Sequence, residues 1–373
     1  MAVRFCIFHS EENMKKILCL FLAFCLLFSG CAKEEQSRDS VSLWYIQGQE
    51  PEGLEELVNE YNKSLPSGLL PVSLRSFAHE QALAAAFDMK APDLLLCYHT
   101  KAGQLYEQSL LRGCKPRRPE YGGALVESLD YIGRSFFPLG TQVQLLAGSS
   151  DTFDEAVFSD LEGFCRAAVD YTKENSKAAF TADDFSALFC HALLSLDTQF
   201  HAELSADKNK DVFKYVYNLL IETVLEGAML STEYSSFDVL MASKLPYAFV
   251  NSRDLAKMQH ELQVYPEPAF KSSLKYPGLC LGLAVTAGEG RSLASIESFL
   301  DYVNQAEVNS SLALASGLVP AVPDMRQSDS SLKNRLMEIG AYYELFLPVA
   351  DSDYMKNRLR FEAVFRNTIN RLY

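Results

Sequence analysis

Amide, carboxyl and aromatic side chains gather at the end of the first predicted strand, residues 41–46. Trp44 and Tyr45 lie within this strand, and Gln47 and Glu50 follow it. Amide and carboxylate groups can form hydrogen bonds with the hydroxyl groups of a solute, and an aromatic face can stack on it. Successive side chains of a strand point to opposite faces, so at most one of the two aromatic residues faces the core. Trp44 is therefore either a core residue or a stacking surface, and the segment predicts a site for a polar solute.

A second group of polar side chains follows the short buried strand predicted for residues 94–97. It consists of Tyr98, His99, Thr100 and Lys101. Ligands of open α/β sheets bind beyond the carboxyl ends of the strands, which makes this segment a candidate binding site. Two alternatives stay open: a lone histidine is often a surface or satisfied core residue, and Lys101 can simply begin a solvated helix.

Motifs for catalysis are weak. A Ser-x-x-Lys spacing occurs at Ser272 and Lys275, but no Lys-Thr-Gly or Ser-Asp-Asn companion accompanies it. The sequence also lacks the GxSxG and HExxH patterns and the phosphate-binding GxxxxGK loop. Adjacent carboxylates such as Asp183 and Asp184 point apart and do not frame a bond for acid–base catalysis. The sequence therefore favours a binding protein over an enzyme.

The beginning of the chain predicts an export signal with a lipid anchor. Two lysines precede an unbroken apolar run of 12 residues, 17–28, which is the length of a signal-peptide core and short for a membrane span. Two small residues then precede Cys31, in the pattern of a bacterial lipobox whose cysteine becomes lipidated. We expect translation to start at Met14, a leader over residues 1–30 and a polar tether over 31–40. An ordinary cleaved signal peptide remains the alternative.

The charge balance restricts the classes of partner. The chain has 373 residues, with 34 Lys and Arg against 48 Asp and Glu, a net charge of −14. With 48% hydrophobic and 22% charged residues, the composition is that of a globular protein. A general nucleic-acid binder needs a cationic surface that displaces counterions, so we expect no nucleic-acid partner.

Five cysteines remain once the predicted leader and the lipidated cysteine are set aside. They are Cys97, Cys114, Cys165, Cys190 and Cys280. An odd and scattered set does not form a disulfide framework, although a single bridge between Cys97 and Cys114 stays open. Neighbouring Cys and His residues lack the spacing of a structural zinc site. We therefore expect no metal and no cofactor.

The elements that must position these residues alternate at first between strand and helix. Strands are expected at 41–46, 71–77 and 94–97, and helices from Pro51, over 80–89 and over 101–111. This order implies a parallel, doubly wound sheet. Helical periodicity then dominates residues 154–257. Later strands are expected at 245–250 and 279–286, and later helices at 292–315, 331–346 and 352–372.

Three stretches together resemble the extracellular solute-binding lipoproteins of ABC importers, the group that contains maltose-binding proteins. They read VSLWYIQGQEPEGLEELVNEYNKS, APDLLLCYHTKAGQLYEQSLL and GLCLGLAVTAGEGRSLASIESFLDYVNQAEVNSSLALASGLVPAV. The resemblance lies in their order and spacing, combined with the lipobox. Where the family has a strand and loop with Gly-Pro-Trp, this chain reads LPYAFVNSRDL, and Trp44 is its only tryptophan.

The resemblance implies an α/β fold of the periplasmic-binding-protein type. Its two lobes are each expected to contain a mostly parallel sheet flanked by helices, and crossing strands are expected to form a hinge. Lobe one would be residues 41–143 with 267–308, and lobe two 144–266 with 309–373. Residues 98–101 would line the cleft on one side, with the opposing wall formed by Tyr247, Asn251 and Arg253.

The function implied by the resemblance is capture of a small solute, a sugar or oligosaccharide, for delivery to the transmembrane subunits of an ABC permease. The protein would be an extracytoplasmic monomer attached to the membrane through lipid on Cys31. The alternative is a relative that keeps the fold but acts as a surface interaction or sensory lipoprotein.

Overall fold

The computed structural model describes most of the chain after the predicted tether. The described residues are 40–117, 121, 125, 129–148, 152–196, 210–231, 234–243, 245–257, 262–269, 275–287, 293–322, 330–348 and 353–372. The expected start at Met14, the leader and Cys31 therefore lie outside the described residues.

Six strands form the first sheet, in the spatial order β11-β4-β10-β3-β1-β2. Their bounds are β1 Val41–Ile46, β2 Val72–Phe77, β3 Leu94–Tyr98, β4 Phe136–Gln142, β10 Leu279–Val285 and β11 Val319–Pro320. β1 pairs in parallel with β2 and β3, as the alternation of strands and helices predicts. β10 pairs with β3 and β4, so the segment 279–286 rejoins the first sheet as expected.

The direction of β10 corrects the expectation of a mostly parallel sheet. Tyr98, at the end of β3, lies opposite Leu281, near the start of β10. The chain enters β10 at the sheet edge where β3 ends, because it arrives from the second sheet, and it must then run antiparallel to β3. β11 is also antiparallel to β4, and it brings part of the range 309–373 into the first sheet.

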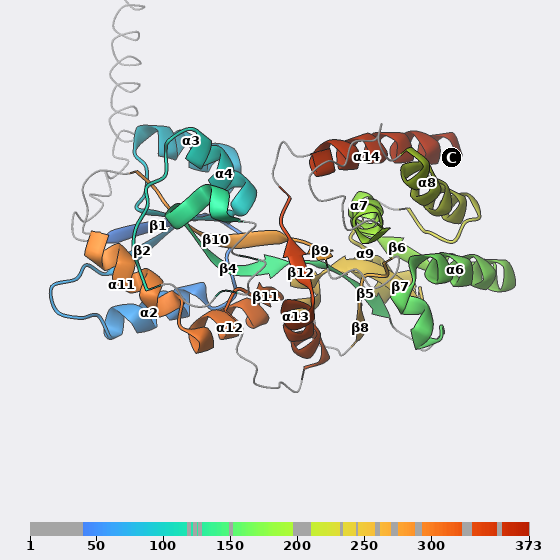
Figure 1. The fold of residues 1–373 in the computed structure, drawn as a ribbon. Helices are drawn as coiled ribbons and strands as arrows, with labels where there is room; N and C mark the ends of the chain where they lie inside the picture. Colours follow the sequence, from blue (N-terminus) through green and yellow to red (C-terminus); the bar gives the residue numbers. More distant parts are fainter. Residues whose placement is uncertain are drawn as a thin grey trace, which may run out of the picture. The chain divides into compact units, whose positions relative to one another are not determined.

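Helices cover both faces of the first sheet (Figure 1). On one face lie α2 (Leu54–Lys63), α11 (Leu293–Val303) and α12 (Ala306–Ala315), and on the other lie α3 (Glu80–Met89) and α4 (His99–Glu107). The amphipathic pattern of α2 buries Leu54, Leu57, Val58 and Tyr61. Tyr61 meets Phe299 of α11 edge to face, with 5.1 Å between the ring centroids.

The single helix expected over residues 292–315 is broken between α11 and α12. Gln305, at the N-cap of α12, has extended backbone with φ −63° and ψ 133°. The break allows Asn309 to reach the first sheet: its amide donates to the Pro138 carbonyl at 3.4 Å and accepts from the Val322 N–H at 3.0 Å.

Four strands form the second sheet, in the order β6-β7-β5-β8. They are β5 Gln144–Gly148, β6 Phe180–Ala182, β7 Tyr247–Asn251 and β8 Gln263–Pro266. β6 and β7 are parallel, but β5 is antiparallel to both β7 and β8. The expectation of a mostly parallel sheet is wrong here too, because β5 enters the sheet directly from β4 rather than through a crossover helix.

Helices surround the second sheet. They are the short η2 (Glu155–Ser159), α6 (Leu161–Asn175), α7 (Phe185–Leu196), α8 (Lys210–Leu225), α9 (Ser236–Ser243) and α10 (Ser252–Ala256). The last helix, α14 (Asp353–Leu372), packs on α7, where Phe361 stacks on Phe189 with 4.0 Å between the rings. A small parallel pair is formed by β9 (Lys275–Pro277) and β12 (Glu344–Phe346). In the chain, α13 (Ser331–Tyr342) comes before β12, and α14 comes after it.

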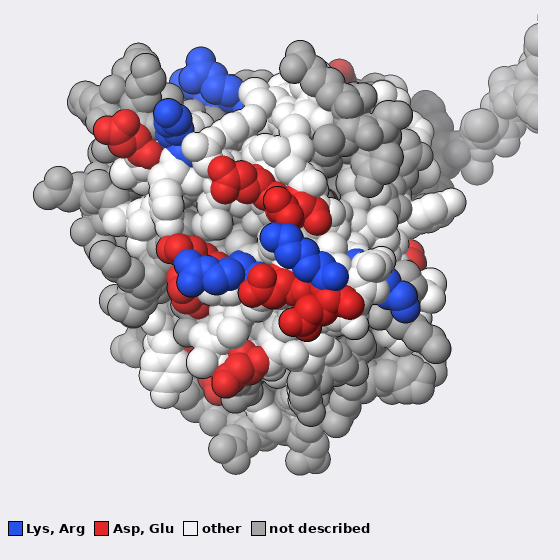
Figure 2. Space-filling view, turned by 90° about the vertical axis from the view of Figure 1, so that its right-hand side faces the viewer, with Lys and Arg blue, Asp and Glu red and all other residues white. Residues whose placement is uncertain are grey.

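The end of the molecule that carries α6 and α8 presents both signs of charge. Acidic and basic side chains alternate on this face rather than separating into two patches (Figure 2). Arg166 pairs with Glu162 at 2.8 Å, and Lys173 pairs with Glu226 at 3.2 Å. These exposed pairs balance one another locally and contribute little to stability.

We expect Phe299→Ala to destabilise the protein by about 3–5 kcal/mol, because Phe299 is fully buried between α2 and α11 and its loss leaves a cavity. Urea unfolding would measure the change. Leu293→Ala, at a position 40% exposed on the same helix, is the matched control and should cost about 0.5 kcal/mol or less. Equal costs for both variants would contradict this packing.

Candidate functional site

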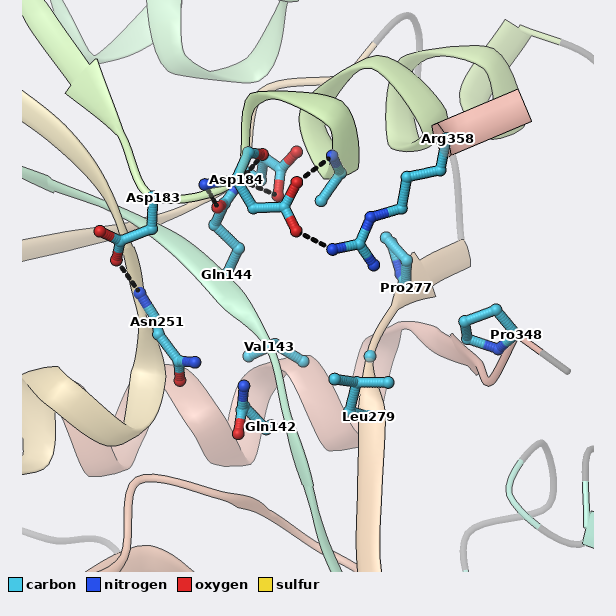
Figure 3. A pocket seen from close by; sticks show the side chains of 13 residues that line it. Gln142, Val143, Gln144, Asp183, Asp184, Asn251, Pro277, Leu279, Pro348 and Arg358 are labelled. Atoms are coloured by element: carbon cyan, nitrogen blue, oxygen red, sulfur yellow. Dashed lines mark hydrogen bonds and ion pairs between the residues drawn. The ribbon is translucent and has the colours of Figure 1, made fainter. Parts of the chain in front are cut away.

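A cavity of about 110 Å³ lies where the strands of the two sheets meet (Figure 3). Its lining comes from the ends of β4, β5, β7 and β10, the turn before α7, and α14. Only Val143 separates β4 from β5, so Gln142 and Gln144 flank the crossing and both line the cavity. The cavity is therefore lined by groups from both sheets.

The side chain of Gln144 is held by the turn that precedes α7. Its amide nitrogen donates to the Asp184 carbonyl at 3.3 Å, and its amide oxygen accepts from the Asp184 N–H at 3.2 Å. The same nitrogen lies 3.4 Å from the carboxylate of Glu267. These contacts orient a polar amide at the hinge.

Two adjacent carboxylates stand beside this amide and have different tasks. Asp183 accepts hydrogen bonds from the backbone N–H groups of Ser236, at 2.6 Å, and Asn251, at 3.2 Å. Asp184 accepts from the Ala187 N–H at 2.8 Å, at the start of α7, and forms an ion pair with Arg358. The two side chains point to different partners, as adjacent positions predict (Figure 3).

A second cavity, of about 250 Å³, lies at the carboxyl ends of β1 and β3. Three predicted site residues line it, namely Tyr98, Thr100 and Lys101. The Lys101 ammonium group pairs with Glu80 at 3.0 Å. Gln47, by contrast, is exposed and donates to the Ser76 hydroxyl at 3.2 Å, and it lines neither cavity.

Gln142 of the first cavity and Tyr98 of the second are joined in a bridge with Arg253. The Tyr98 hydroxyl donates to the Gln142 side chain at 2.7 Å and accepts from Arg253 at 3.2 Å. Arg253 also donates to the main-chain carbonyls of Gln49, at 3.2 Å, and Glu50, at 2.8 Å. Three predicted site residues, Glu50, Tyr98 and Arg253, are thus brought together, although only the backbone of Glu50 takes part.

Trp44 is a core residue, which corrects its expected role as a stacking surface. It is 2% exposed, packs against Phe77 with 5.0 Å between the rings, and lies under the guanidinium of Arg75 at 5.0 Å. Tyr45, on the opposite side of β1, is partly buried, and burial followed by the Glu50 charge raises the pKa of its hydroxyl. It lines neither cavity.

His99 and Tyr247 are also buried and cannot contact a solute in this structure. His99 is fully buried: its Nδ1 accepts from the Cys280 N–H at 3.2 Å, which leaves Nε2–H to donate to the Pro348 carbonyl at 3.0 Å. Tyr247 is 1% exposed and lies against Phe153, with 4.8 Å between the rings. Both sit at strand ends, but their side chains point into the core rather than toward the cavities.

Several cavity residues were not among the predicted site residues. They are Gln142, Gln144, Asp183, Asp184, Glu267 and Arg358. The sequence signal for the two glutamines is their place on either side of a predicted crossing. Arg358 comes from α14, the last helix, so no local pattern could have placed it beside Asp184.

The described cysteines are buried thiols. None of Cys97, Cys114, Cys165, Cys190 and Cys280 forms a disulfide. Burial raises the pKa of the Cys97 and Cys165 thiols to about 12, which suppresses the reactive thiolate at neutral pH. In the described part of the chain, no three His, Cys, Asp or Glu side chains converge as a metal site would require.

No protein-family model and no curated protein matches this chain, but its fold matches solved structures. The cyclic α-maltosyl-1,6-maltose binding protein from Arthrobacter globiformis is 14% identical, with a TM-score of 0.64 over 89% of this chain and 94% of that protein. Maltodextrin binding protein MalE1 from L. casei BL23 is 14% identical, with a TM-score of 0.64 over 88% and 92%.

A third solved structure extends the range of ligands. The spermidine/putrescine ABC transporter substrate-binding protein PotD from Streptococcus pneumoniae is 12% identical, with a TM-score of 0.63 over 88% of this chain and 99% of that protein. These matches confirm the fold expected from the sequence: this chain has the two-lobed α/β fold of ABC substrate-binding proteins.

We expect the stability of the protein to fall on acidification because of His99. Burial lowers the pKa of this histidine below its ordinary value of 6.5. Between pH 6.5 and the folded pKa, the unfolded chain therefore binds a proton at His99 and the folded chain does not. The stability contribution is complete above pH 6.5 and is lost as the pH falls toward the folded pKa, at up to about 1.4 kcal/mol per pH unit.

Urea unfolding of His99→Gln between pH 8 and pH 5 would measure this effect. The variant should be less stable than the unaltered protein at pH 8, with a shallower loss toward pH 5. Gln47→Ala, at an exposed residue that does not titrate, is the control and should keep the original slope. Parallel curves for His99→Gln and the unaltered protein would rule out this assignment.

Proposed function

We propose that this protein is an extracytoplasmic solute-binding protein that captures a small solute, a sugar or oligosaccharide, and delivers it to an ABC permease. The observation that carries the proposal is the polar cavity at the strand crossing. It draws groups from both sheets, namely Gln142 from the first and Asn251 from the second. A solute held there touches both lobes and favours their closure, since only a difference in affinity shifts that equilibrium.

The chemistry of the lining supports a hydroxylated solute. Side-chain amides of Gln142, Gln144 and Asn251 both donate and accept hydrogen bonds, and Asp183 and Glu267 accept them. Sugar hydroxyls need this mixture of donors and acceptors. Two of the structural matches bind maltose-type sugars by name, which agrees with this choice, whereas the polyamine-binding match keeps amines as an alternative solute.

We further propose the lobe boundaries given by the resemblance, residues 41–143 with 267–308, and 144–266 with 309–373, except that α12 and β11 pack in the first lobe. The lobes would move about the crossings near Val143 and Pro266, without enzymatic turnover. The receptor would work as a monomer, held to the membrane by lipid on Cys31. Across the part of the chain that the structure describes, no helix is long and apolar enough to cross a bilayer.

One observation favours a second function, that of a surface interaction or sensory lipoprotein which keeps the fold. The cavities of about 110 and 250 Å³ are each smaller than the roughly 300–1,000 Å³ of a typical small-molecule site. A protein with this fold that had lost its solute site would show no solute-dependent stabilisation.

A thermal-shift screen of the purified protein against sugars, peptides and polyamines would separate these functions. A sugar at 100 times its dissociation constant should add about 2.7 kcal/mol to stability. Gln142→Ala should lower the affinity for that sugar, because it removes an amide from the cavity lining. Gln47→Ala, outside both cavities, should leave the affinity unchanged. Stabilisation by polyamines alone would contradict a sugar ligand.

Lipid attachment at Cys31 is tested separately from solute binding. Thioether formation needs the sulfur, so Cys31→Ser should abolish incorporation of labelled palmitate. The variant should either be released from the membrane or keep its leader uncleaved. Cys97→Ser, at a buried thiol far along the chain, should keep the label. Label that persists on Cys31→Ser would disprove lipidation at this residue.

A further inference from the structure

Arg253 reaches from the second lobe to the first. It belongs to α10, directly after β7 of the second sheet, and its three hydrogen-bond partners lie after β1 and at the end of β3 of the first sheet. All three acceptors are uncharged: the carbonyl oxygens of Gln49 and Glu50 and the hydroxyl of Tyr98. Among the described residues, Arg253 forms no ion pair, so these neutral oxygens alone hold its guanidinium.

The backbone of Arg253 is fixed to the hinge. The Asn251 side chain accepts the Arg253 N–H at 2.9 Å. The neighbouring Ser252 is fully buried, donates its N–H to the Val143 carbonyl at 2.9 Å, and accepts the Val143 N–H on its hydroxyl at 3.2 Å. Because Val143 is the residue between the two sheets, the base of the arginine is anchored at the pivot while its tip contacts the other lobe.

This bridge also lies between the two cavities. Gln142 lines one cavity, Tyr98 lines the other, and they share a hydrogen bond with the Arg253 guanidinium alongside. Gln49, whose carbonyl receives the arginine, lines the second cavity as well. Arg253 itself lines neither cavity, but it holds residues that do.

We propose that the oxygens of Gln49, Glu50 and Tyr98 form an acceptor site for a donor group of the solute, and that Arg253 is its internal occupant. In the absence of solute the arginine holds the lobes together. A solute must displace it, so the apparent affinity is reduced by the fraction of molecules in which the site is free. That the displacing donor is a sugar hydroxyl rests on the proposed function; the self-occupied site does not.

Small-angle X-ray scattering of the solute-free protein tests the bridge. Arg253→Ala should increase the radius of gyration, because the lobes lose the contact that holds them together. Arg253→Lys keeps the charge but cannot reach three acceptors with one planar group, and it should give a smaller increase. Arg166→Ala, at an exposed arginine whose partner Glu162 is on the same helix, should leave the radius unchanged. An unchanged radius for Arg253→Ala would overturn the proposal.

Chemical rescue tests the acceptor site itself. Millimolar guanidinium chloride, far below denaturing concentration, should raise the melting temperature of Arg253→Ala, since the ion can occupy the vacated oxygens of the first lobe, and should not raise that of the unaltered protein, whose site is filled. Sodium chloride at the same ionic strength should not stabilise Arg253→Ala. Equal responses of the variant and the unaltered protein to guanidinium would overturn the assignment of the site. Both experiments contain no sugar, so they can fail or succeed independently of the proposed transport function.

Discussion

The most restrictive feature of this structure is the single-residue crossing between the two sheets. Val143 is 2% exposed, and both of its backbone groups bond to Ser252 of the second lobe. Buried backbone groups must be paired, so these two hydrogen bonds fix the path of the chain from β4 of the first sheet into β5 of the second. Because side chains alternate along an extended chain, the residues on either side, Gln142 and Gln144, point the same way, into one cavity.

A buried polar cluster supports the crossing from behind. The Tyr276 hydroxyl donates to the Gln144 carbonyl at 2.5 Å and accepts from the Glu267 N–H at 2.7 Å. Burial raises the pKa of this tyrosine well above its ordinary value, so it remains a neutral donor. Glu267 is 1% exposed at its side chain and lies 3.4 Å from Nδ1 of His191. The two Tyr276 hydrogen bonds tie residues on both sides of the crossing together, which makes the hinge a defined pivot rather than a loose linker.

The local elements of this fold were predictable, because their signals are local. The helix over residues 80–89 and the strand over 41–46 were predicted with the bounds that the structure gives. Strand direction was not predictable, since β10 and β5 owe theirs to where the chain crosses between sheets. One element bound was wrong at the site: the helix expected from residue 101 begins at His99. His99 begins α4 and lies under Pro348, a residue 249 positions further along the chain.

The candidate site was predictable only in part, and the reason is the same. Tyr98 ends β3 and Arg253 follows β7, and strand ends gather where the two sheets approach each other, which brings these two residues within hydrogen-bond distance. Trp44 and Tyr247 sit near strand ends too, but which way a side chain points depends on the helices that cover the sheet. Trp44 packs under α3 residues in one core cluster, and Tyr247 packs with α6 residues in another. The sequence of neither helix indicates which strand residue it will cover.

The chemistry of the Arg253 bridge suits a contact that must break. Separating a buried ion pair leaves an uncompensated charge and costs about 3–5 kcal/mol. The acceptors of Arg253 are two carbonyls and a phenol, and water can replace the arginine on each of them without stranding a charge. Asp184 and Arg358 show the contrasting case: their ion pair joins α14 to the turn before α7 within the wall of the cavity. The molecule thus places one of its ion pairs within a wall of the cavity, and neutral hydrogen bonds where the two lobes meet.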